Sequence, residues 1–214
     1  MPAKTDAHKA IIELSKHWDG FEFQRHNKRD PWRILVSGII SARTTDEVTY
    51  PATTRLFEKW ATISELAKAD PEEVGKTIYP AGFYKTKGQR LVELANELIT
   101  RFGGRVPDDI DNLVSLKGVG RKIANLVLSL GFHIPAICVD THVHRISNRA
   151  GWVETKTPDQ TETALMKLIP KDLWIVTNEP LVRLGQNICK PTKPNCEVCP
   201  ISKFCKTGKE ALGK

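Results

Sequence analysis

Hydrophobic positions along most of the chain recur three or four residues apart, which is the spacing of one face of a helix. The clearest example is residues 86–102, whose hydrophobic face is formed by Leu91, Leu94, Ala95 and Leu98. The alternation of apolar and polar residues that indicates a strand is scarce, and its best candidate, residues 137–139, is only three residues long. The pattern therefore predicts an all-α protein.

Proline and small polar residues predict where several of these helices begin. Asp30-Pro31 and Asp70-Pro71 each combine an N-cap residue with proline at the first helical position. Pro51 predicts a further helix start after a short polar stretch. No long repeat and no low-complexity linker interrupts the series. Any second domain must therefore form from segments of the same helical chain.

Composition places the chain among folded globular proteins. Of its 214 residues, 40% are hydrophobic and 27% are charged. No apolar run approaches the ~20 residues that cross a bilayer. The first 20 residues carry charges throughout and lack the apolar core of a signal peptide. We therefore expect a cytoplasmic protein without a membrane partner.

The positive charge is concentrated near the C-terminus. The chain has 32 Lys and Arg against 25 Asp and Glu, a formal net charge of +7. Residues 181–214 hold seven Lys and Arg against two Glu, so they contribute +5 of this charge. A polyanion is the usual partner of such a segment, and a merely solubilising basic tail is the alternative.

Four of the five cysteines, Cys189, Cys196, Cys199 and Cys205, lie within 17 residues in the spacing C-x6-C-x2-C-x5-C. Structural zinc sites usually combine two short Cys pairs from separate places in the chain. A single loop that carries four thiolates suits a compact [4Fe–4S] cluster better. Zinc and unligated thiols remain as alternatives on spacing alone. Cys138 has no such partner and is predicted to be buried.

Residues 111–130 predict two short helices joined by a tight turn. The first helix ends near Leu116, and Gly118 and Gly120 allow the turn its unusual backbone angles. The free N–H groups of such a turn and of the following helix suit a phosphate, so the element can hold a DNA backbone without reading its sequence. A plain helix–helix turn with a glycine cap is the alternative.

Two residues near this hairpin are candidates for chemistry. Lys122 falls in the first turn of the second helix, where the helix dipole and partial desolvation favour the neutral, nucleophilic amine. Asp140 precedes another helix, and its carboxylate could stabilise positive charge on a sugar. The structural alternatives are an ordinary solvated lysine and an N-cap aspartate.

These features, in this order, resemble the endonuclease III family of DNA glycosylase/AP lyases within the helix–hairpin–helix–GPD superfamily. The resemblance covers roughly residues 30–205 and rests on three motifs: LKGVGRKIAN from Leu116, VDTHVHRISNR from Val139, and the cysteine spacing. It implies a six-helix barrel domain with the hairpin at residues 24–134. It also implies a discontinuous helical domain, residues 1–23 and 135–214, whose four cysteines hold a [4Fe–4S] cluster.

Carried over to this chain, the resemblance implies that Lys122 attacks the sugar C1′ and that Asp140 assists. It also implies that Arg43 and Phe83 fill the gap left by a flipped base. Lys117 replaces the usual proline of the hairpin, Arg43 stands where glutamine is common, and Val114 occupies a position that is acidic in some relatives. The remaining DNA contacts are expected at Leu116, Lys117, Gly118, Val119, Gly120, Arg121, Lys190 and Lys193.

The resemblance implies a bifunctional base-excision-repair enzyme. It would remove oxidised pyrimidines such as thymine glycol from duplex DNA and cleave the abasic strand by β-elimination. The expected partner is duplex DNA with damaged bases or abasic sites, bound by a monomer associated with the nucleoid. The alternatives are a mismatch glycosylase for G:T or G:U pairs, which usually lacks a lysine at position 122, and a non-catalytic DNA-binding module.

Overall fold

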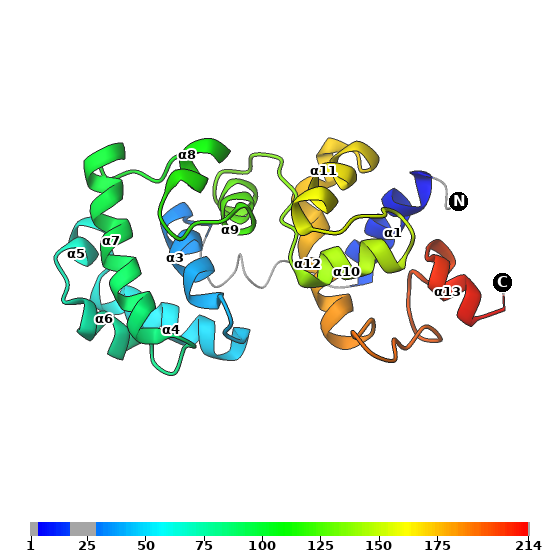
Figure 1. Cartoon of the computed structure of the whole chain (residues 1–214), viewed down its shortest axis with the longest axis horizontal. Helices are drawn as coiled ribbons and strands as arrows, with labels where there is room; N and C mark the ends of the chain where they lie inside the picture. Colours follow the sequence, from blue (N-terminus) through cyan, green and yellow to red (C-terminus); the bar gives the residue numbers. More distant parts are fainter. Residues whose placement is uncertain (1–3, 18–28, 214) are drawn as a thin grey trace. The chain divides into compact units, whose positions relative to one another are not determined.

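The structure is a computed structural model that describes residues 4–17 and 29–213. The chain forms two compact units, one within residues 22–134 and one from residues 1–21 and 135–214 (Figure 1). The predicted boundary between residues 23 and 24 lies outside the described residues. Every secondary-structure element of the described residues is helical, and residues 137–139 form no strand there. The prediction of an all-α protein is confirmed.

The unit that contains residues 29–134 is built around one buried helix. Its elements are α3 (Pro31–Ser41), α4 (Asp46–Lys59), α5 (Ile63–Ala67), α6 (Pro71–Ile78), α7 (Tyr84–Phe102), α8 (Ile110–Ser115), α9 (Arg121–Leu126) and the π-helical turn η1 (Val127–Gly131). Helix α3 packs against α4, α7, α9 and η1. Its residues from Ile34 to Ile40 are all buried, because neighbouring helices cover most of its surface.

Two of the three predicted helix starts are confirmed. Asp30 accepts a hydrogen bond from the backbone of Trp32, and Asp70 caps α6 in the same way. The start predicted at Pro51 is wrong, because α4 begins at Asp46 and contains the proline. Carboxylates in the first turn stabilise the positive end of a helix, so the acidic residues before the proline belong to the helix itself.

Helices α6 and α7 approach each other with their backbones almost in contact. A Cβ atom built at Gly88 of α7 would lie 2.5 Å from the backbone nitrogen of Gly75 in α6. Real Cβ atoms essentially never come that close, so only glycine fits there. The 19-residue helix α7 contains the predicted helix 86–102 and ends at Phe102, and the Gly103 that follows as its C-cap has a φ of 61°. This packing fixes the short loop between α6 and α7.

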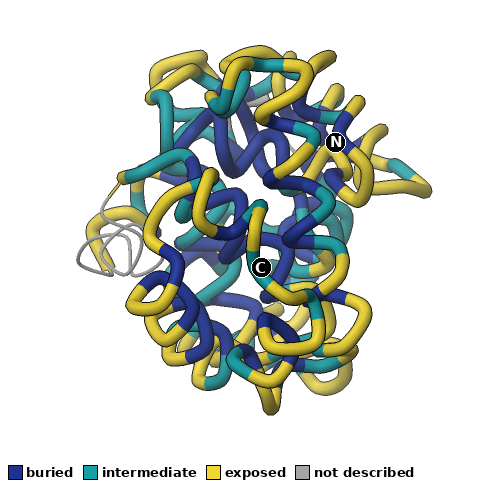
Figure 2. Tube along the Cα trace, turned by 90° about the vertical axis from the view of Figure 1, so that its left-hand side faces the viewer, coloured by how far each residue is buried: buried dark blue, intermediate teal, exposed yellow. Residues whose placement is uncertain are grey.

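The other unit consists of α1 (Lys4–His17), α10 (Thr141–Arg149), α11 (Pro158–Leu168), η2 (Lys171–Leu173), α12 (Trp174–Asn187), η3 (Ser202–Phe204) and α13 (Lys206–Ala211). Helix α1 contributes Ile11 and Leu14 to a core shared with α10 and α12. Buried and exposed stretches alternate along the helices, as amphipathic helices require (Figure 2). Cys138 is buried, as predicted. Across residues 4–17 and 29–213, no helix has the length and hydrophobicity to cross a bilayer.

Candidate nucleic-acid interface and cysteine pocket

The predicted hairpin is formed by α8, a tight turn and α9. The backbone N–H of Val119 donates to the carbonyl of Leu116 at 3.0 Å and closes the turn. Gly118 has a φ of 83°, in the left-handed region that favours glycine. Leu116 and Val119 are buried, so only their backbone groups can meet a ligand. Among the hairpin residues predicted to contact DNA, the exposed ones are Lys117, Gly118, Gly120 and Arg121.

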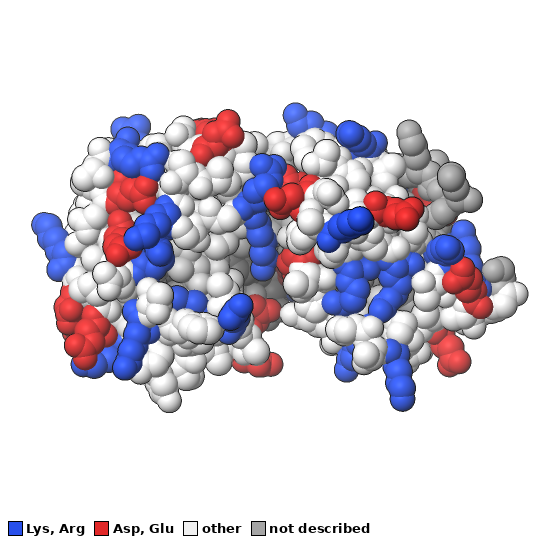
Figure 3. Space-filling model, in the orientation of Figure 1, with Lys and Arg blue, Asp and Glu red and all other residues white. Residues whose placement is uncertain are grey.

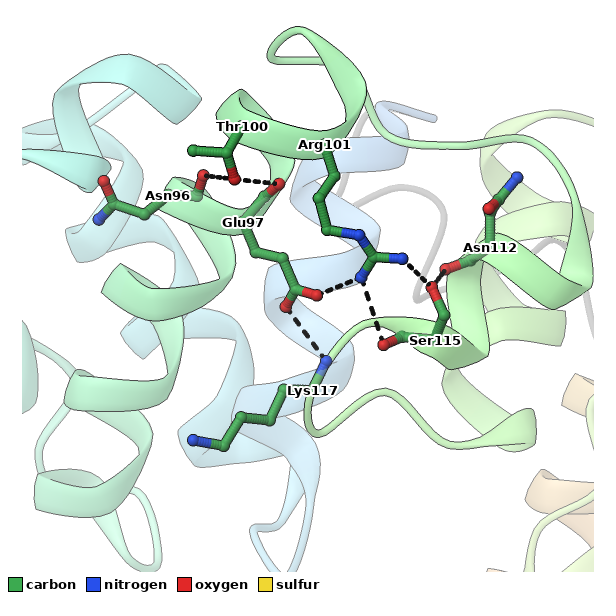
Figure 4. Close-up of polar contacts among 7 residues, drawn as sticks. All are labelled: Asn96, Glu97, Thr100, Arg101, Asn112, Ser115 and Lys117. Carbon is green, nitrogen blue, oxygen red and sulfur yellow. Dashed lines mark hydrogen bonds and ion pairs between the residues drawn. The ribbon is translucent and has the colours of Figure 1, made fainter.

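Side chains of α7 hold the first half of this hairpin in place (Figure 4). One carboxylate oxygen of Glu97, Oε2, accepts the backbone N–H of Lys117 at 3.3 Å, and the other, Oε1, pairs with Arg101. Arg101 in turn donates to the hydroxyl of Ser115 at 2.7 Å. The turn is therefore fastened to a long helix that lies outside the hairpin.

The side chain of Lys117 forms an exposed ion pair with Glu93. Its Nζ lies 3.3 Å from a carboxylate oxygen of Glu93, and both side chains are exposed. The hydrogen bond from Lys117 lowers the pKa of Glu93 below its ordinary value. An exposed ion pair contributes little stability, so a phosphate could replace Glu93 as the partner of Lys117.

Lys122 is an exposed residue in the first turn of α9. The apolar side of this helix packs onto α3, where Ile123 lies so close to Gly38 that an added Cβ would meet it at 3.1 Å. This contact turns the first residues of α9 outward. The exposure of Lys122 gives no support to the partial desolvation expected from the sequence.

Arg43 and Phe83, predicted from segments far apart in the sequence, lie together in the structure. The Arg43 guanidinium carbon lies 5.5 Å from the centre of the Phe83 ring. Both residues have positive φ, 54° and 59°, which is unfavourable for residues other than glycine. Phe83 is 61% exposed. The pair therefore forms an exposed arginine–aromatic contact on two constrained loops.

Asp140, in the other unit, is the N-cap of α10. Its Oδ1 accepts the backbone N–H groups of His142 and Val143, each at 2.9 Å. Both bonds use the same oxygen, so Oδ2 of Asp140 takes no part in capping the helix. The capping role predicted as the structural alternative is present, and it is compatible with a second role for the other oxygen.

The four clustered cysteines line one pocket. Its walls include apolar residues of α10 and α12, among them Ile146 and Leu184. Burial raises the pKa of Cys199 to about 11 and also raises the pKa of Cys205. Within the described part of the chain, no three His, Cys, Asp or Glu side chains form a site for a metal ion. The thiols share the walls of one pocket.

Arg149 joins the cysteine loop to α10. It donates to Sγ of Cys189 at 3.3 Å and to the carbonyl oxygens of Lys190 and Pro191, each at 2.7 Å. The side chains of Lys190 and Lys193 remain exposed on the loop. Figure 3 shows Lys and Arg side chains on the visible face of both units, with acidic side chains between them in several places.

Several residues that support these elements were missed by sequence reasoning, above all Glu97, Arg101, Arg149 and Lys87. Most of them lie on exposed or half-buried helix faces, where a charged residue is ordinary and does not indicate a specific contact. Lys87 is different, because it lies four residues before Leu91 on the buried face of α7. A charge on an apolar face was the signal available.

Comparison with known proteins identifies relatives that match most of the chain. Residues 36–171 match the family model described as HhH-GPD superfamily base excision DNA repair protein. A Thermotoga maritima protein named endonuclease III is 50% identical over 182 residues, which cover 85% of each chain. Both matches span well over half of the chain.

Two solved structures are also similar. The structure of a trapped endonuclease III–DNA covalent intermediate has a TM-score of 0.89 and 36% identity, over 99% of this chain and 100% of that one. A thermostable thymine-DNA glycosylase has a TM-score of 0.84 and 27% identity, over 97% and 96%. The chain belongs to the HhH-GPD superfamily of base excision DNA repair proteins and, within it, to the endonuclease III family.

Proposed function

We propose that this protein is a DNA glycosylase and AP lyase that acts on damaged bases and abasic sites in duplex DNA. The observation that carries the proposal is an exposed lysine, Lys122, in the first turn after a glycine hairpin. The covalent endonuclease III–DNA intermediate named among the similar structures supports chemistry of this kind. The chromosome would be its place of action.

Lys122 supplies the nucleophile. Its amine nitrogen forms a bond to C1′ of the damaged nucleotide while the bond from C1′ to the base breaks, and the base leaves with the electron pair. Opening of the sugar ring gives a Schiff base between the lysine and C1′. Loss of a proton from C2′ then expels the 3′ phosphate by β-elimination, and water releases the lysine.

Asp140 assists with its carboxylate. A negative charge beside the sugar stabilises the positive charge that develops as the base departs. The same group can accept a proton during the later steps. The two backbone bonds to Oδ1 fix the rotamer of the side chain, which favours such a positioned role.

The hairpin and the constrained loops bind the DNA. Backbone N–H groups at Gly118 and Gly120, with Lys117 and Arg121 beside them, suit phosphates and carry no base specificity. Arg43 and Phe83 would enter the stack when the target nucleotide leaves it, because an enzyme must extrude a base to reach its sugar. An oxidised pyrimidine such as thymine glycol is the proposed target.

The cysteine pocket is proposed to hold a [4Fe–4S] cluster through Cys189, Cys196, Cys199 and Cys205. The fit rests on four thiols around one pocket and on two N–H donors, from Arg149 and Gly208, that already reach cysteine sulfurs at 3.3 Å. Iron–sulfur bonds would hold the loop that carries Lys190 and Lys193. The two compact units would then be the barrel domain and the cluster domain of the family.

A mismatch glycosylase is the second candidate, supported by the similarity to a thymine-DNA glycosylase. A panel of duplexes that each contain one thymine glycol, G:T, G:U or abasic site separates the two, with borohydride added to trap any Schiff base. We expect base release and trapping with thymine glycol, and trapping at the abasic site. Release of mismatched bases without trapping would favour the second candidate, and no product from any duplex would contradict both.

A further inference from the structure

Lys87 is a buried lysine whose three N–H donors all meet oxygen atoms. Its side chain belongs to the first turns of α7, and the residue is only 7% exposed. Its Nζ lies 2.6 Å from the carbonyl oxygen of Ile40, 2.7 Å from that of Ala42 and 2.9 Å from Oγ1 of Thr44. An ammonium group has three N–H bonds, so the contacts match its donors in number.

These contacts enclose Arg43 from both sides in the sequence. Ala42 and Thr44 are its immediate neighbours, and both accept from the same ammonium group. Arg43 itself has a φ of 54°, a left-handed conformation that is unfavourable for a residue with a side chain. Such a conformation persists where the surroundings hold it. Lys87 supplies that restraint.

The loop that carries Phe83 is attached to the same group of atoms. The backbone N–H of Gly82 donates to Oγ1 of Thr44 at 3.1 Å, the oxygen that also accepts from Lys87. A Cβ atom at Gly82 would lie 2.6 Å from the carbonyl oxygen of Arg43, so the two loops are in backbone contact. Lys87 also donates its own backbone N–H to the carbonyl of Phe83 at 2.9 Å.

The three acceptors are uncharged, and burial lowers the pKa of Lys87 to about 8. Methionine has a similar length and would fill the space, but it would leave the carbonyl oxygens of Ile40 and Ala42 and the hydroxyl of Thr44 without this donor. The hydrogen bonds of Lys87 therefore hold the backbone on both sides of Arg43 in one geometry.

We propose that Lys87 is a positioning residue that holds Arg43 and Phe83 side by side, so that both enter the space left by an extruded nucleotide together. The inference rests on the proposed function, because it assigns these two side chains to DNA. It goes further by making their joint placement depend on one buried amine. Lys87 itself touches neither the sugar nor the base.

The first test compares Lys87→Met with Arg55→Met. Arg55 donates to the carbonyls of Thr77 and Tyr79. Its variant should therefore loosen the loop that carries Phe83 without removing any contact to residues 40–44. The probe is a duplex with a tetrahydrofuran abasic analogue opposite 2-aminopurine, whose fluorescence rises when it is unstacked. We expect Lys87→Met to lose most of this rise and to excise thymine glycol about ten- to a hundredfold more slowly. Affinity for undamaged duplex should stay within about twofold, because phosphate contacts are retained.

An equal loss in Arg55→Met would overturn the proposal, since any loosening of the loop would then suffice. An undiminished fluorescence rise in Lys87→Met would also overturn it. The abasic probe needs no excision, so absence of glycosylase activity in the natural protein would contradict the proposed function while this comparison still decides the role of Lys87.

A second pair of variants avoids the buried position. Thr44→Val removes the oxygen shared by Lys87 and Gly82, while Thr44→Ser keeps it. We expect valine to reproduce the loss of fluorescence and serine to restore it. In a background that carries both Arg43→Ala and Phe83→Ala, Lys87→Met should cause little further loss, because Lys87 acts through those two residues. A full further loss from Lys87→Met in that background would mean that Lys87 acts elsewhere.

Discussion

The hairpin and the cysteine loop are both irregular segments, but they are held in different ways. The hairpin closes on its own backbone and is fastened to α7 by Glu97 and Arg101, which are ordinary side chains of the same unit. The cysteine loop is held by Arg149 and lines a pocket with four thiols. The first segment is held by hydrogen bonds within its own unit, whereas the second is proposed to be held by a [4Fe–4S] cluster as well. The comparison teaches that the two regions should fail independently.

The largest expected effect comes from Lys122→Gln. Glutamine has no nucleophilic amine, so we expect the borohydride-trapped adduct at abasic sites to fall at least about a thousandfold. Affinity for the abasic analogue and the cluster absorbance should both be retained, since neither uses the amine. Trapping at the natural level would show that another residue is the nucleophile.

Loss of one thiol tests the other region. Cys199→Ala should lower the iron content from roughly four per chain and weaken the absorbance near ~400 nm that iron–sulfur centres show. Hydrogen exchange should then increase in residues 189–205, because metal binding is coupled to the folding of a loop. Exchange in the hairpin at residues 116–120 should not change. Equal loosening of both regions would contradict their independence.

The buried amine of Lys87 also predicts that the stability of the protein depends on pH. Burial lowers the pKa of Lys87 to about 8, whereas an unfolded lysine titrates near 10.5. Between these values the unfolded chain binds more protons, so stability rises with pH in this window and the contribution is lost as the pH falls through 8. The unfolding free energy of the natural protein should gain about 1 kcal/mol per pH unit over that of Lys87→Met between pH 8 and 10. A constant difference in urea unfolding would show that the amine stays charged.

The smallest effect is expected from the exposed lysines of the cysteine loop. Changing Lys190 and Lys193 together to alanine should remove up to two phosphate contacts. The slope of log K against log[salt] should then become shallower by up to ~0.9 per contact. Lesion and normal duplexes should lose affinity alike, because phosphate contacts do not read bases. Loss of lesion discrimination with an unchanged slope would place this loop in base recognition.

Local patterns predicted the helices and the hairpin well, because capping residues, glycines and apolar spacing act over a few residues. The start at Pro51 was wrong because acidic residues favourable to a first turn outweighed one lost backbone bond. The contact of Arg43 with Phe83 was beyond such reasoning, since it depends on two loops that meet only after α3, α6 and α7 have packed. The position of Lys87 on the apolar face of α7 could be read from the sequence. Its acceptors at residues 40, 42 and 44 could not, because they come from another part of the chain.

Helix α7 also fixes the spacing between two attachment points. Near one end it carries Lys87 beside the loops of Arg43 and Phe83, and near the other it carries Arg101 beside the hairpin. The two residues are fourteen positions apart, about 21 Å along a regular helix. One residue inserted between them would turn one end by ~100° relative to the other and separate the two attachments. The length of this helix should therefore tolerate far less change than its exposed side chains do.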